Sequence, residues 1–575
     1  MNGGQIIANV LKLYGVEQLF TLCGGHIAPI YVEAEKAGIR VFDVRDEASA
    51  VFAADAIGRL TGIPGVAAVT AGPGVTNAIT ALKNAQMAQS PLLLLGGATA
   101  TLLRGRGALQ DIDQKALVRP HVKWLARARR QKDIGPLLDK AMRLALSGVP
   151  GPVFVELPVD LLYEEKTVRE WYGMKNTGAR SLGEKALQWY INRHVEGLFR
   201  GAGQYRPSPP DGATAPGFTT GQLQAVRRAL QEAERPVAII SSGAMMRPQE
   251  SHLLSAAVQK LGIPVYLSGM ARGLAGHTSS VQYRHQRRKA LREADCILLC
   301  GVPVDFRLDY GRQLGRRARK IAVSRSRAEL RKNLSAEKAL LACPGRFLIA
   351  LAEDTATMPG WEPWKEKLGQ REAEREAEIG KMAAQGVQGI NPVALFQQME
   401  KRIPGNSVLI ADGGDFAATA SYTLRPRKPL GWLDPGAFGT LGVGGGFALG
   451  AALHHPDDYI WIIYGDGSAA YSLMEFDTFR KYGLKVCAII GNNGSWEQIA
   501  RDQVSLLGKD TATVLPRSDY QEVARAFGAA GERVDTLPGF EAAMGRAIAS
   551  MDQGIPYVIN AVIGSTAFRE GSISM

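Results

Sequence analysis

Asp466 and Asn493 carry oxygen ligands, and each follows an apolar, β-rich segment of the chain. Asp466 comes after residues 458–464, and Asn493 comes after residues 484–490. The carboxyl ends of neighbouring parallel strands meet at one edge of an open α/β sheet, where such sheets bind their ligands. Mg²⁺ takes one or two such oxygens from a protein and completes its shell with phosphate and water. The two residues therefore predict a site for Mg²⁺ and a phosphate group.

The segments around Asp466 predict a strand, a turn and a helix in that order. Gly465 and Gly467 flank Asp466 and are expected to let the backbone turn tightly beside a ligand. Residues 471–482 place apolar side chains at helical spacing, so we expect a helix there. A chance Asp-Gly turn between a strand and a helix is the alternative that these residues alone leave open.

Composition limits the class of protein. A chain of 575 residues, 46% hydrophobic and 21% charged, is typical of a globular protein with about three or four domains. The five cysteines lack the spacing of metal ligands and are expected to be small buried side chains in a reducing compartment. No apolar run reaches the roughly 18 residues of a membrane helix, and the N-terminus lacks a signal-peptide pattern. We therefore expect a cytoplasmic protein with no membrane partner.

The formal net charge of +13 favours a polyanionic partner. The sequence contains no motif that reads a nucleic-acid groove, whereas phosphate-rich coenzymes satisfy the same charge. We therefore expect a coenzyme partner and no nucleic acid.

Three α/β blocks, at residues 1–165, 221–355 and 390–575, alternate strand and helix patterns. Residues 166–220 are predicted to be a linker, Pro-rich near its end, and residues 356–389 a charged helical connector. The expected fold is three doubly wound parallel sheets, and the outer two blocks look like variations on one plan.

Several motifs together carry a family resemblance. The spacing of Asp466 and Asn493 resembles the diphosphate-anchoring motif of thiamine diphosphate (ThDP) enzymes. The whole chain resembles the acetolactate synthase superfamily, whose pyrimidine-binding, central and diphosphate-binding domains occur in that order. The matching segments are residues 70–77, 151–160 and 439–444, and residues 83–91 and 434–442 are similar to the 2-hydroxyacyl-CoA lyases of the acetolactate synthase-like type.

The resemblance implies a ThDP and Mg²⁺ site in the third block. Asp466, Asn493 and Ser495 match the metal ligands, the Gly439 carbonyl would accept from the aminopyrimidine, and Leu441 would wedge between the two rings. Ordinary core packing is the alternative for Leu441. The remaining candidate cofactor-binding residues are Gly414, Asp415, Gly465, Gly467, Ser468, Trp496 and Gln498. A carboxylate beside a phosphate, as Asp415 would be, requires another bonding partner.

Three candidate catalytic residues lie in the first block. The resemblance implies that Glu47, just past residues 40–44, bonds the pyrimidine ring and promotes loss of the thiazolium proton. His26 follows a predicted strand and would move a proton on and off the substrate hydroxyl, while Gln110 would lie at the edge of the active site. A solvated glutamate at a helix start and a loop histidine bonded to backbone are the alternatives for Glu47 and His26.

The middle block is strongly basic, with fifteen Arg and Lys residues against five Asp and Glu residues between positions 284 and 332. The planar guanidinium of arginine bonds phosphate oxygens in pairs. The candidates for binding the CoA nucleotide are Arg284, Arg287, Arg288, Arg325 and Arg327, and a solvated basic face is the alternative. FAD or ADP is possible in this block but is not expected.

Three functions remain open at this point. The first is a ThDP-dependent 2-hydroxyacyl-CoA lyase that takes acyl-CoA and yields formyl-CoA and an aldehyde. The second is an acetolactate synthase-type carboligase that acts on pyruvate, and the third is a non-catalytic ThDP-fold binding protein. The resemblance also implies a homodimer or homotetramer in which two subunits share each active site.

Overall fold

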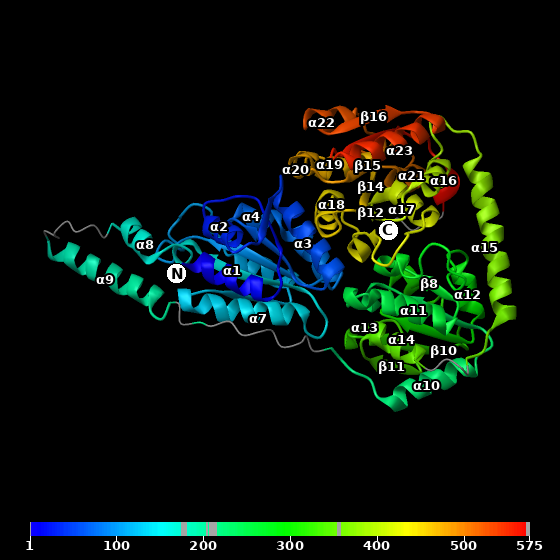
Figure 1. Cartoon of the computed structure of the whole chain (residues 1–575), viewed down its shortest axis with the longest axis horizontal. Helices are drawn as coiled ribbons and strands as arrows, with labels where there is room; N and C mark the ends of the chain where they lie inside the picture. Colours follow the sequence, from blue (N-terminus) through cyan, green and yellow to red (C-terminus); the bar gives the residue numbers. More distant parts are fainter. Residues whose placement is uncertain (1, 174–180, 203–204, 206–214, 354–357, 571–575) are drawn as a thin grey trace. The chain divides into compact units, whose positions relative to one another are not determined.

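The computed structural model describes residues 2–173, 181–202, 205, 215–353 and 358–570. It contains two compact units, Met1–Thr214 and Ala215–Met575, which run from blue to cyan and from green to red in Figure 1. Most of the predicted Pro-rich stretch, residues 204 and 206–212, lies outside the described residues.

The first unit is built on a six-stranded parallel sheet in the order β2-β1-β3-β4-β6-β5. Its strands are β1 (Gln18–Thr21), β2 (Arg40–Asp43), β3 (Gly65–Val69), β4 (Leu92–Ala98), β5 (Trp124–Arg127) and β6 (Pro152–Pro158). Its first seven helices are α1 (Gly3–Leu13), α2 (Ala28–Lys36), α3 (Glu47–Thr61), α4 (Pro73–Asn77), α5 (Ile79–Met87), α6 (Gln114–Val118) and α7 (Ile134–Leu146).

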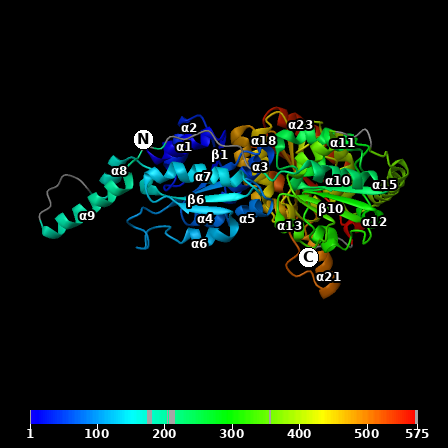
Figure 2. The same ribbon diagram turned by 90° about the horizontal axis from the view of Figure 1, so that it is seen from below.

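Helices cover both faces of this sheet. In Figure 2, α1 and α7 lie on one side of β6, and α4, α5 and α6 lie on the other. The central strands β3, β4 and β6 are buried along their whole length. Strands covered on both faces carry continuous apolar runs rather than alternating ones, which is why β4 begins with four leucines.

The segment predicted as a linker begins with two helices, α8 (Glu165–Trp171) and α9 (Leu182–Phe199). Val195, Leu198 and Phe199 in the last turn of α9 are buried in the core of the first unit. The N-terminal half of α9 is exposed, and Figure 1 shows it projecting from that unit.

The second unit contains two sheets. The central sheet has the order β11-β10-β9-β7-β8, and its strands are β7 (Pro236–Ile240), β8 (Val265–Leu267), β9 (Cys296–Cys300), β10 (Arg319–Ser324) and β11 (Lys338–Leu341). Its helices are α10 (Thr220–Gln231), α11 (Ser251–Leu261), α12 (Arg287–Glu293), α13 (Arg327–Arg331) and α14 (Pro344–Ala352). The predicted charged connector forms α15 (Glu362–Ala383).

The third sheet has the order β13-β12-β14-β15-β17-β16. Numbered within its own domain, this is the order of the first sheet, so the predicted common plan is confirmed. Its strands are β12 (Ser407–Ala411), β13 (Trp432–Leu433), β14 (Tyr459–Gly465), β15 (Val486–Asn492), β16 (Ala530–Val534) and β17 (Tyr557–Val562). Its helices are α16 (Pro392–Arg402), α17 (Gly414–Thr423), α18 (Val443–His454), α19 (Asp466–Ser472), α20 (Glu475–Tyr482), α21 (Glu497–Leu507), α22 (Tyr520–Ala526) and α23 (Leu537–Asp552).

The three-sheet α/β prediction is confirmed, with two local corrections. The helix expected over residues 471–482 is interrupted at Leu473 and Met474, between α19 and α20. Cys23 is exposed, whereas the other four cysteines are buried as expected.

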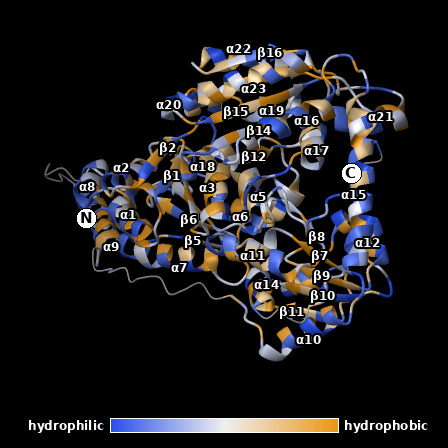
Figure 3. Ribbon diagram, turned by 45° about the vertical axis from the view of Figure 1, so that its right-hand side comes forward, coloured by the Kyte–Doolittle hydropathy of each residue, from blue (hydrophilic) through white to orange (hydrophobic). Residues whose placement is uncertain are grey.

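Figure 3 shows the hydrophobic residues concentrated on the strands. Within the described ranges, no helix is long and apolar enough to cross a membrane.

Candidate functional site

Asp466 begins α19 directly after β14, and its carboxylate is buried. Its Oδ2 accepts from the backbone N–H of Gly494 at 2.7 Å and of Ser495 at 3.3 Å, and its Oδ1 accepts from Gly467 N at 2.9 Å. Burial raises the pKa of Asp466, although these backbone donors oppose the shift. The side chain therefore bridges the loop after β14 and the loop after β15.

Asn493 lies on the second of these loops, at the end of β15. Its Oδ1 accepts from Ser495 N at 3.1 Å, and its Nδ2 donates to Glu497 Oε2 at 2.9 Å. The amide is thereby oriented by a carboxylate on one side, which leaves a second lone pair of its oxygen for a cation. Asp466 and Asn493 line one pocket, as the sequence predicts for neighbouring strand ends.

The two glycines beside Asp466 lie at the turn from β14 to α19 and line the pocket, but neither needs the backbone freedom of glycine. Gly465 has a φ of −73°, and Gly467 lies in regular helix, so neither supplies a left-handed turn. Gly467 is instead required by space, because a Cβ there would lie 2.4 Å from the ring of Trp496. Trp496 thus packs directly on the helix that Asp466 begins.

The pocket around Asp466 has a volume of about 300 Å³ and holds all the cofactor-binding and metal candidates. These are Gly414, Asp415, Gly439, Leu441, Gly465, Asp466, Gly467, Ser468, Asn493, Ser495, Trp496 and Gln498. Leu441 is half-buried, and a Cβ on Gly413 would lie 2.3 Å from its Cδ2. Because Leu441 stands over a glycine at the pocket wall, it is not an ordinary core residue.

The donor set fits a metal-bound diphosphate. Hard oxygens from Asp466 and Asn493 suit Mg²⁺. The N-terminus of α17, at Gly414, lines the same pocket, and unsatisfied N–H groups at a helix start favour phosphate. Asp415 has the partner that its position requires, since its Oδ1 lies 2.5 Å from Arg501 Nη2 and 3.8 Å from Arg569 Nε.

Asp412 is a residue of this site that sequence reasoning missed. It follows β12 and is buried, and its two oxygens accept from Gly442 N at 3.0 Å and Gly444 N at 2.6 Å. It therefore fixes the start of α18, immediately after Leu441. Burial raises the pKa of Asp412 to about 7. The strand-end position that identified Asp466 was the available signal for Asp412 as well.

Glu47 is buried at the first position of α3 in the first unit, after the N-cap residue Asp46. Its Oε2 accepts from Asn77 Nδ2 at 3.0 Å. A Cβ on Gly74 would lie 3.4 Å from its Oε1. The solvated-glutamate alternative is wrong because the carboxyl lies against α4, whose Asn77 sequence reasoning did not single out.

His26 and Gln110 lie on loops that follow β1 and β4. Burial lowers the pKa of His26, and its Nδ1 lies 3.3 Å from Thr70 Oγ1. Gln110 has a φ of +62°, a conformation that non-glycine residues seldom adopt and that is enriched at functional sites. A Cβ on Gly72 would lie 2.9 Å from the Cβ of Gln110.

Comparisons with known proteins fit this geometry. The N-terminal TPP-binding, central and C-terminal TPP-binding domains of thiamine pyrophosphate enzymes match residues 1–117, 223–351 and 412–561, TPP being the same compound as ThDP. A protein named 2-hydroxyacyl-CoA lyase 2 from Bos taurus is 47% identical over 100% of this chain and 92% of its own length. The chain belongs to the thiamine pyrophosphate enzyme family.

Other proteins are also similar to this chain over most of its length. The 2-hydroxyacyl-CoA lyase 2 of Danio rerio is 45% identical over 100% of this chain and 93% of its own length. A probable acetolactate synthase of Mycobacterium bovis is 33% identical over 97% of this chain and 95% of its own length. The solved ThDP-dependent 4-hydroxybenzoylformate decarboxylase of Rhodococcus jostii RHA1 covers 98% of this chain and 99% of its own at a TM-score of 0.77 and 21% identity. That likeness is one of fold.

A second pocket of this ThDP-family enzyme, of about 610 Å³, also lies within the second unit. Arginines dominate its lining: Arg272, Arg284, Arg287, Arg288, Arg375 and Arg425. Glu372 is the only carboxylate among the described residues that line it. Burial lowers the pKa of Arg284 to about 10, and the charge of Arg425 adds to the effect. Burial also lowers the pKa of Arg272 and Arg287. The like charges of this pocket would be relieved by an anion.

The arginine candidates separate into two groups. Arg284, Arg287 and Arg288 line the arginine pocket. Arg325 does not, because its side chain turns inward, is only 7% exposed and places Nη2 3.3 Å from Cys343 Sγ. Arg327 is exposed at the start of α13 and does not line this pocket either. The two groups are therefore not one phosphate site.

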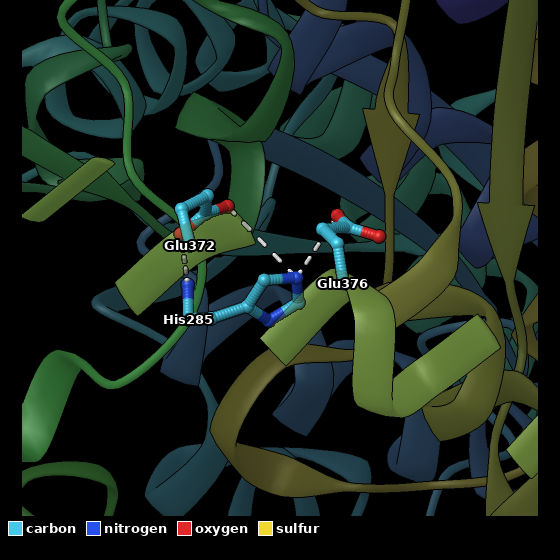
Figure 4. A group of neighbouring side chains, drawn as sticks. All are labelled: His285, Glu372 and Glu376. Atoms are coloured by element: carbon cyan, nitrogen blue, oxygen red, sulfur yellow. Dashed lines mark hydrogen bonds and ion pairs between the residues drawn. The ribbon is translucent and has the colours of Figure 1, made fainter. Parts of the chain in front are cut away.

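His285, Glu372 and Glu376 meet beside the arginine pocket, with ligand atoms all within 4.8 Å of one another (Figure 4). His285 Nε2 lies 3.1 Å from Glu376 Oε1, and this hydrogen bond is the main cause that lowers the pKa of Glu376 to about 2. Glu372 accepts from the backbone N–H of Arg284 and His285, and Arg425 pairs with Glu376 at 3.1 Å. These carboxylates are already engaged, so the cluster ties α15 to the segment before α12 and is a poor cation site.

Proposed function

We propose that this protein is a ThDP- and Mg²⁺-dependent 2-hydroxyacyl-CoA lyase. It would break the C1–C2 bond of a 2-hydroxyacyl-CoA to give formyl-CoA and an aldehyde, in a reversible reaction. The hydroxyl loses its proton as the aldehyde forms, and C1 gains a proton as formyl-CoA forms, so the atoms balance. The names and identities of the full-length relatives support this reaction.

The observation that carries the proposal is the placement of the two pockets along α17. Gly414, Asp415 and Thr419, toward its N-terminus, line the pocket around Asp466, whereas Ser421 and Tyr422, near its C-terminus, line the arginine pocket. A helix of ten residues is about 15 Å long. The flexible pantetheine arm of a CoA ester can bridge such a span, with the reacting thioester at one end and the nucleotide phosphates at the other.

The residues of the first pocket would hold the cofactor. Asp466 and Asn493, with Ser495, would ligate Mg²⁺ on the diphosphate, while Gly439 and Leu441 would orient the pyrimidine ring. When bound, ThDP supplies the carbanion-stabilising chemistry that the reaction requires. A protein with these groups needs to add only orientation and proton transfer.

Glu47 and His26 would carry the protons. The carboxyl of Glu47, held by Asn77, would bond the pyrimidine ring and move a proton there. Because burial lowers the pKa of His26, its imidazole is neutral near pH 7. In the tautomer whose Nδ1–H donates to Thr70 Oγ1, Nε2 is free and would take the proton of the substrate hydroxyl. Gln110 would lie at the edge of the same site.

The deciding experiment supplies ThDP and Mg²⁺ with either a 2-hydroxyacyl-CoA or pyruvate. We expect formyl-CoA and an aldehyde from the first and no acetolactate from the second. Acetolactate alone would establish the carboligase alternative, which the 33% identical probable acetolactate synthase favours. No product with either substrate, together with ThDP binding, would favour the non-catalytic alternative.

The arginine pocket has its own test. Changing Arg287 and Arg288 together to Gln removes two cations from the pocket, and the matched control is Arg327→Gln, outside it. Charge-assisted hydrogen bonds are worth about 1.5–3 kcal/mol each, so losing two should raise KM for the CoA ester by roughly 10²-fold to 10⁴-fold. The pantetheine ester, which lacks the nucleotide, should be turned over as by the parent. Equal losses on both esters would indicate a folding effect, and no loss on either would place the nucleotide elsewhere.

Assembly as a homodimer or homotetramer is part of the proposal. Exposed apolar side chains gather on and around α21 and α19, including Leu506, Leu507, Val514, Tyr471 and Met474. Contiguous apolar patches on a chain surface mark interaction sites, so these side chains are the candidates for a subunit interface. Light scattering should give two or four times the chain mass of 61.8 kDa, and a monomer at micromolar concentration would contradict the assignment.

A further inference from the structure

Gln114 is a buried residue of the first unit, and its side-chain amide hydrogen-bonds to several separate segments. It begins α6 and is 1% exposed. Its Oε1 accepts from Gly72 N at 2.9 Å, and its Nε2 donates to Gly97 O at 3.0 Å and to Glu156 Oε1 at 2.9 Å. A single side chain therefore joins the loop after β3, the end of β4 and the strand β6.

The bond to Gly72 reaches two of the proposed catalytic side chains. Gly72 has a φ of +64° and is the N-cap of α4, the helix that ends at Asn77 and so holds Glu47. Gly72 also lies directly against Gln110, so closely that a Cβ there would be 2.9 Å from the Cβ of Gln110. A shift of Gly72 would displace the support of Glu47 and of Gln110 together.

The bond to Gly97 reaches His26, the third of the proposed catalytic side chains. A Cβ on Gly97 would lie 2.8 Å from the Cβ of His26, so backbone and side chain are in close contact there. Such close contacts transmit displacement because packed interiors yield little. The position of the His26 loop thus depends on where the end of β4 is held.

Glu156 determines which way the amide faces. It is fully buried on β6, and its other oxygen, Oε2, pairs with Arg127. Because a carboxylate only accepts, the NH₂ group of Gln114 must face it, and the carbonyl oxygen must then face Gly72 N–H. A buried carboxylate that lost this donor would be left partly unsatisfied at a cost in free energy.

We propose that Gln114 is a positioning residue for His26, Glu47 and Gln110, because it holds Gly72 and Gly97, the two glycines that lie against these side chains or their supports. This rests on the proposed function for the roles of those three residues. The joining of the loop after β3, the end of β4 and the strand β6 by Gln114 is a property of the folded chain, and it can be measured without any substrate.

The test compares Gln114→Met with Gln131→Met. Both remove a buried glutamine amide from the first unit, but the Gln131 amide donates to Leu161 O, away from Gly72 and Gly97. Hydrogen exchange is followed in the cofactor-free protein over peptides covering residues 70–78 and 96–112. Gln114→Met should raise exchange in both segments and leave β6 protected, whereas Gln131→Met should leave both segments as in the parent.

Kinetics give the second measurement. With Gln114→Met, kcat should fall by about 10²-fold, the scale of a 1 Å misplacement, while KM for the CoA ester and the Kd for ThDP stay within a few-fold. Glu156→Gln, which keeps Gln114 but releases the constraint on its amide, should give a smaller loss and provides a second variant if Gln114→Met does not fold.

Two failures are distinguishable. A parent protein without lyase activity overturns the proposed function but leaves the exchange comparison to decide the role of Gln114. The role of Gln114 is overturned if Gln114→Met has the same exchange and the same kcat as Gln131→Met. It is also overturned if Glu156→Gln has the same exchange and the same kcat as the parent. Either result would stand even if the lyase reaction is confirmed.

Discussion

The first and third sheets share one strand order but hold their functional loops with different chemistry. In the first sheet, neutral amides hold these segments: Gln114 joins the loop after β3 to the end of β4, and Asn77 holds Glu47. In the third, the buried carboxylates of Asp412 and Asp466 accept from backbone N–H groups of neighbouring loops. A common topology thus decides where the loops meet and leaves open what fixes them. Amides do not titrate, so the backbone contacts that Asp412 and Asp466 make should depend on pH more than those that Gln114 makes.

The largest effect should come from Glu47, the carboxyl that an amide supports. Glu47→Gln keeps the shape and removes the ionisable proton, so exchange of the thiazolium C2 proton, followed by NMR, should slow by about 10²–10⁴-fold while ThDP still binds. The control is Asp46→Asn, which keeps the N-cap of α3. An exchange rate equal to that of the parent would remove Glu47 from the mechanism.

Asp466 tests the role of a buried carboxylate in the third sheet. Asp466→Ala removes the charged oxygen expected on Mg²⁺, and breaking a buried charged pair costs about 3–5 kcal/mol. Calorimetric affinity for ThDP and Mg²⁺ should therefore fall by about 10²-fold to 10³-fold or more. Asp457→Ala, an exposed acid just before β14, should bind as the parent does. Equal affinities in the two variants would contradict the metal assignment.

Asp412 sharpens the comparison through pH. Its pKa of about 7 in the folded state lies above the usual 3.8, so the folded state favours the protonated form. Its contribution to the free energy of unfolding is thus fully present below about pH 4 and is lost as pH rises through about 7. The loss is on the order of 4 kcal/mol at most, from about 3 pKa units at 1.36 kcal/mol each.

Urea unfolding of the cofactor-free protein at a series of pH values measures this term. Asp412→Asn should flatten the decline in stability between pH 4 and pH 7, and Asp457→Asn should not. A slope in Asp412→Asn as steep as in the parent would show that Asp412 does not titrate there.

The smallest effect should come from Asn77, which reaches Glu47 from an exposed position. Asn77→Ala removes one hydrogen bond to a charged group, and about 1.4 kcal/mol corresponds to a tenfold change. Exchange of the C2 proton should slow by about tenfold. Thr76→Ala removes only a local bond to Pro73 O and serves as the control. A matched rate in both variants would mean that Glu47 needs no support from α4.

The sequence predicted the parts of the site that lie at strand ends. Asp466 and Asn493 follow the neighbouring strands β14 and β15, and the parallel order of that sheet brings both to one edge of one pocket. Glu47 was singled out by its motif, and it begins α3 in the first unit. Gln114 gave no such signal, because it resembles any polar residue at a helix start and its partner Gly72 is 42 positions away. Only the folded sheet brings them together.

The arginines show a different limit. A count of charges between residues 284 and 332 cannot tell a side chain that faces a pocket from one that turns inward. Arg287 lines the arginine pocket, whereas Arg325, at the end of β10, turns inward toward Cys343. The direction of a side chain after a strand depends on the packing of the next helix, which the local sequence does not fix.

The helix α17 also restricts how this enzyme can evolve. Residues of its N-terminal part line one pocket and residues of its last turn line the other. The spacing between the two pockets along the helix can therefore change only in steps of one residue. Inserting or deleting one residue would rotate everything beyond it by about 100° and shift it by about 1.5 Å. Small adjustments of spacing are therefore not accessible by gradual change. Descendants of this chain should be able to vary the aldehyde they release much more readily than the length of the carrier arm that brings it.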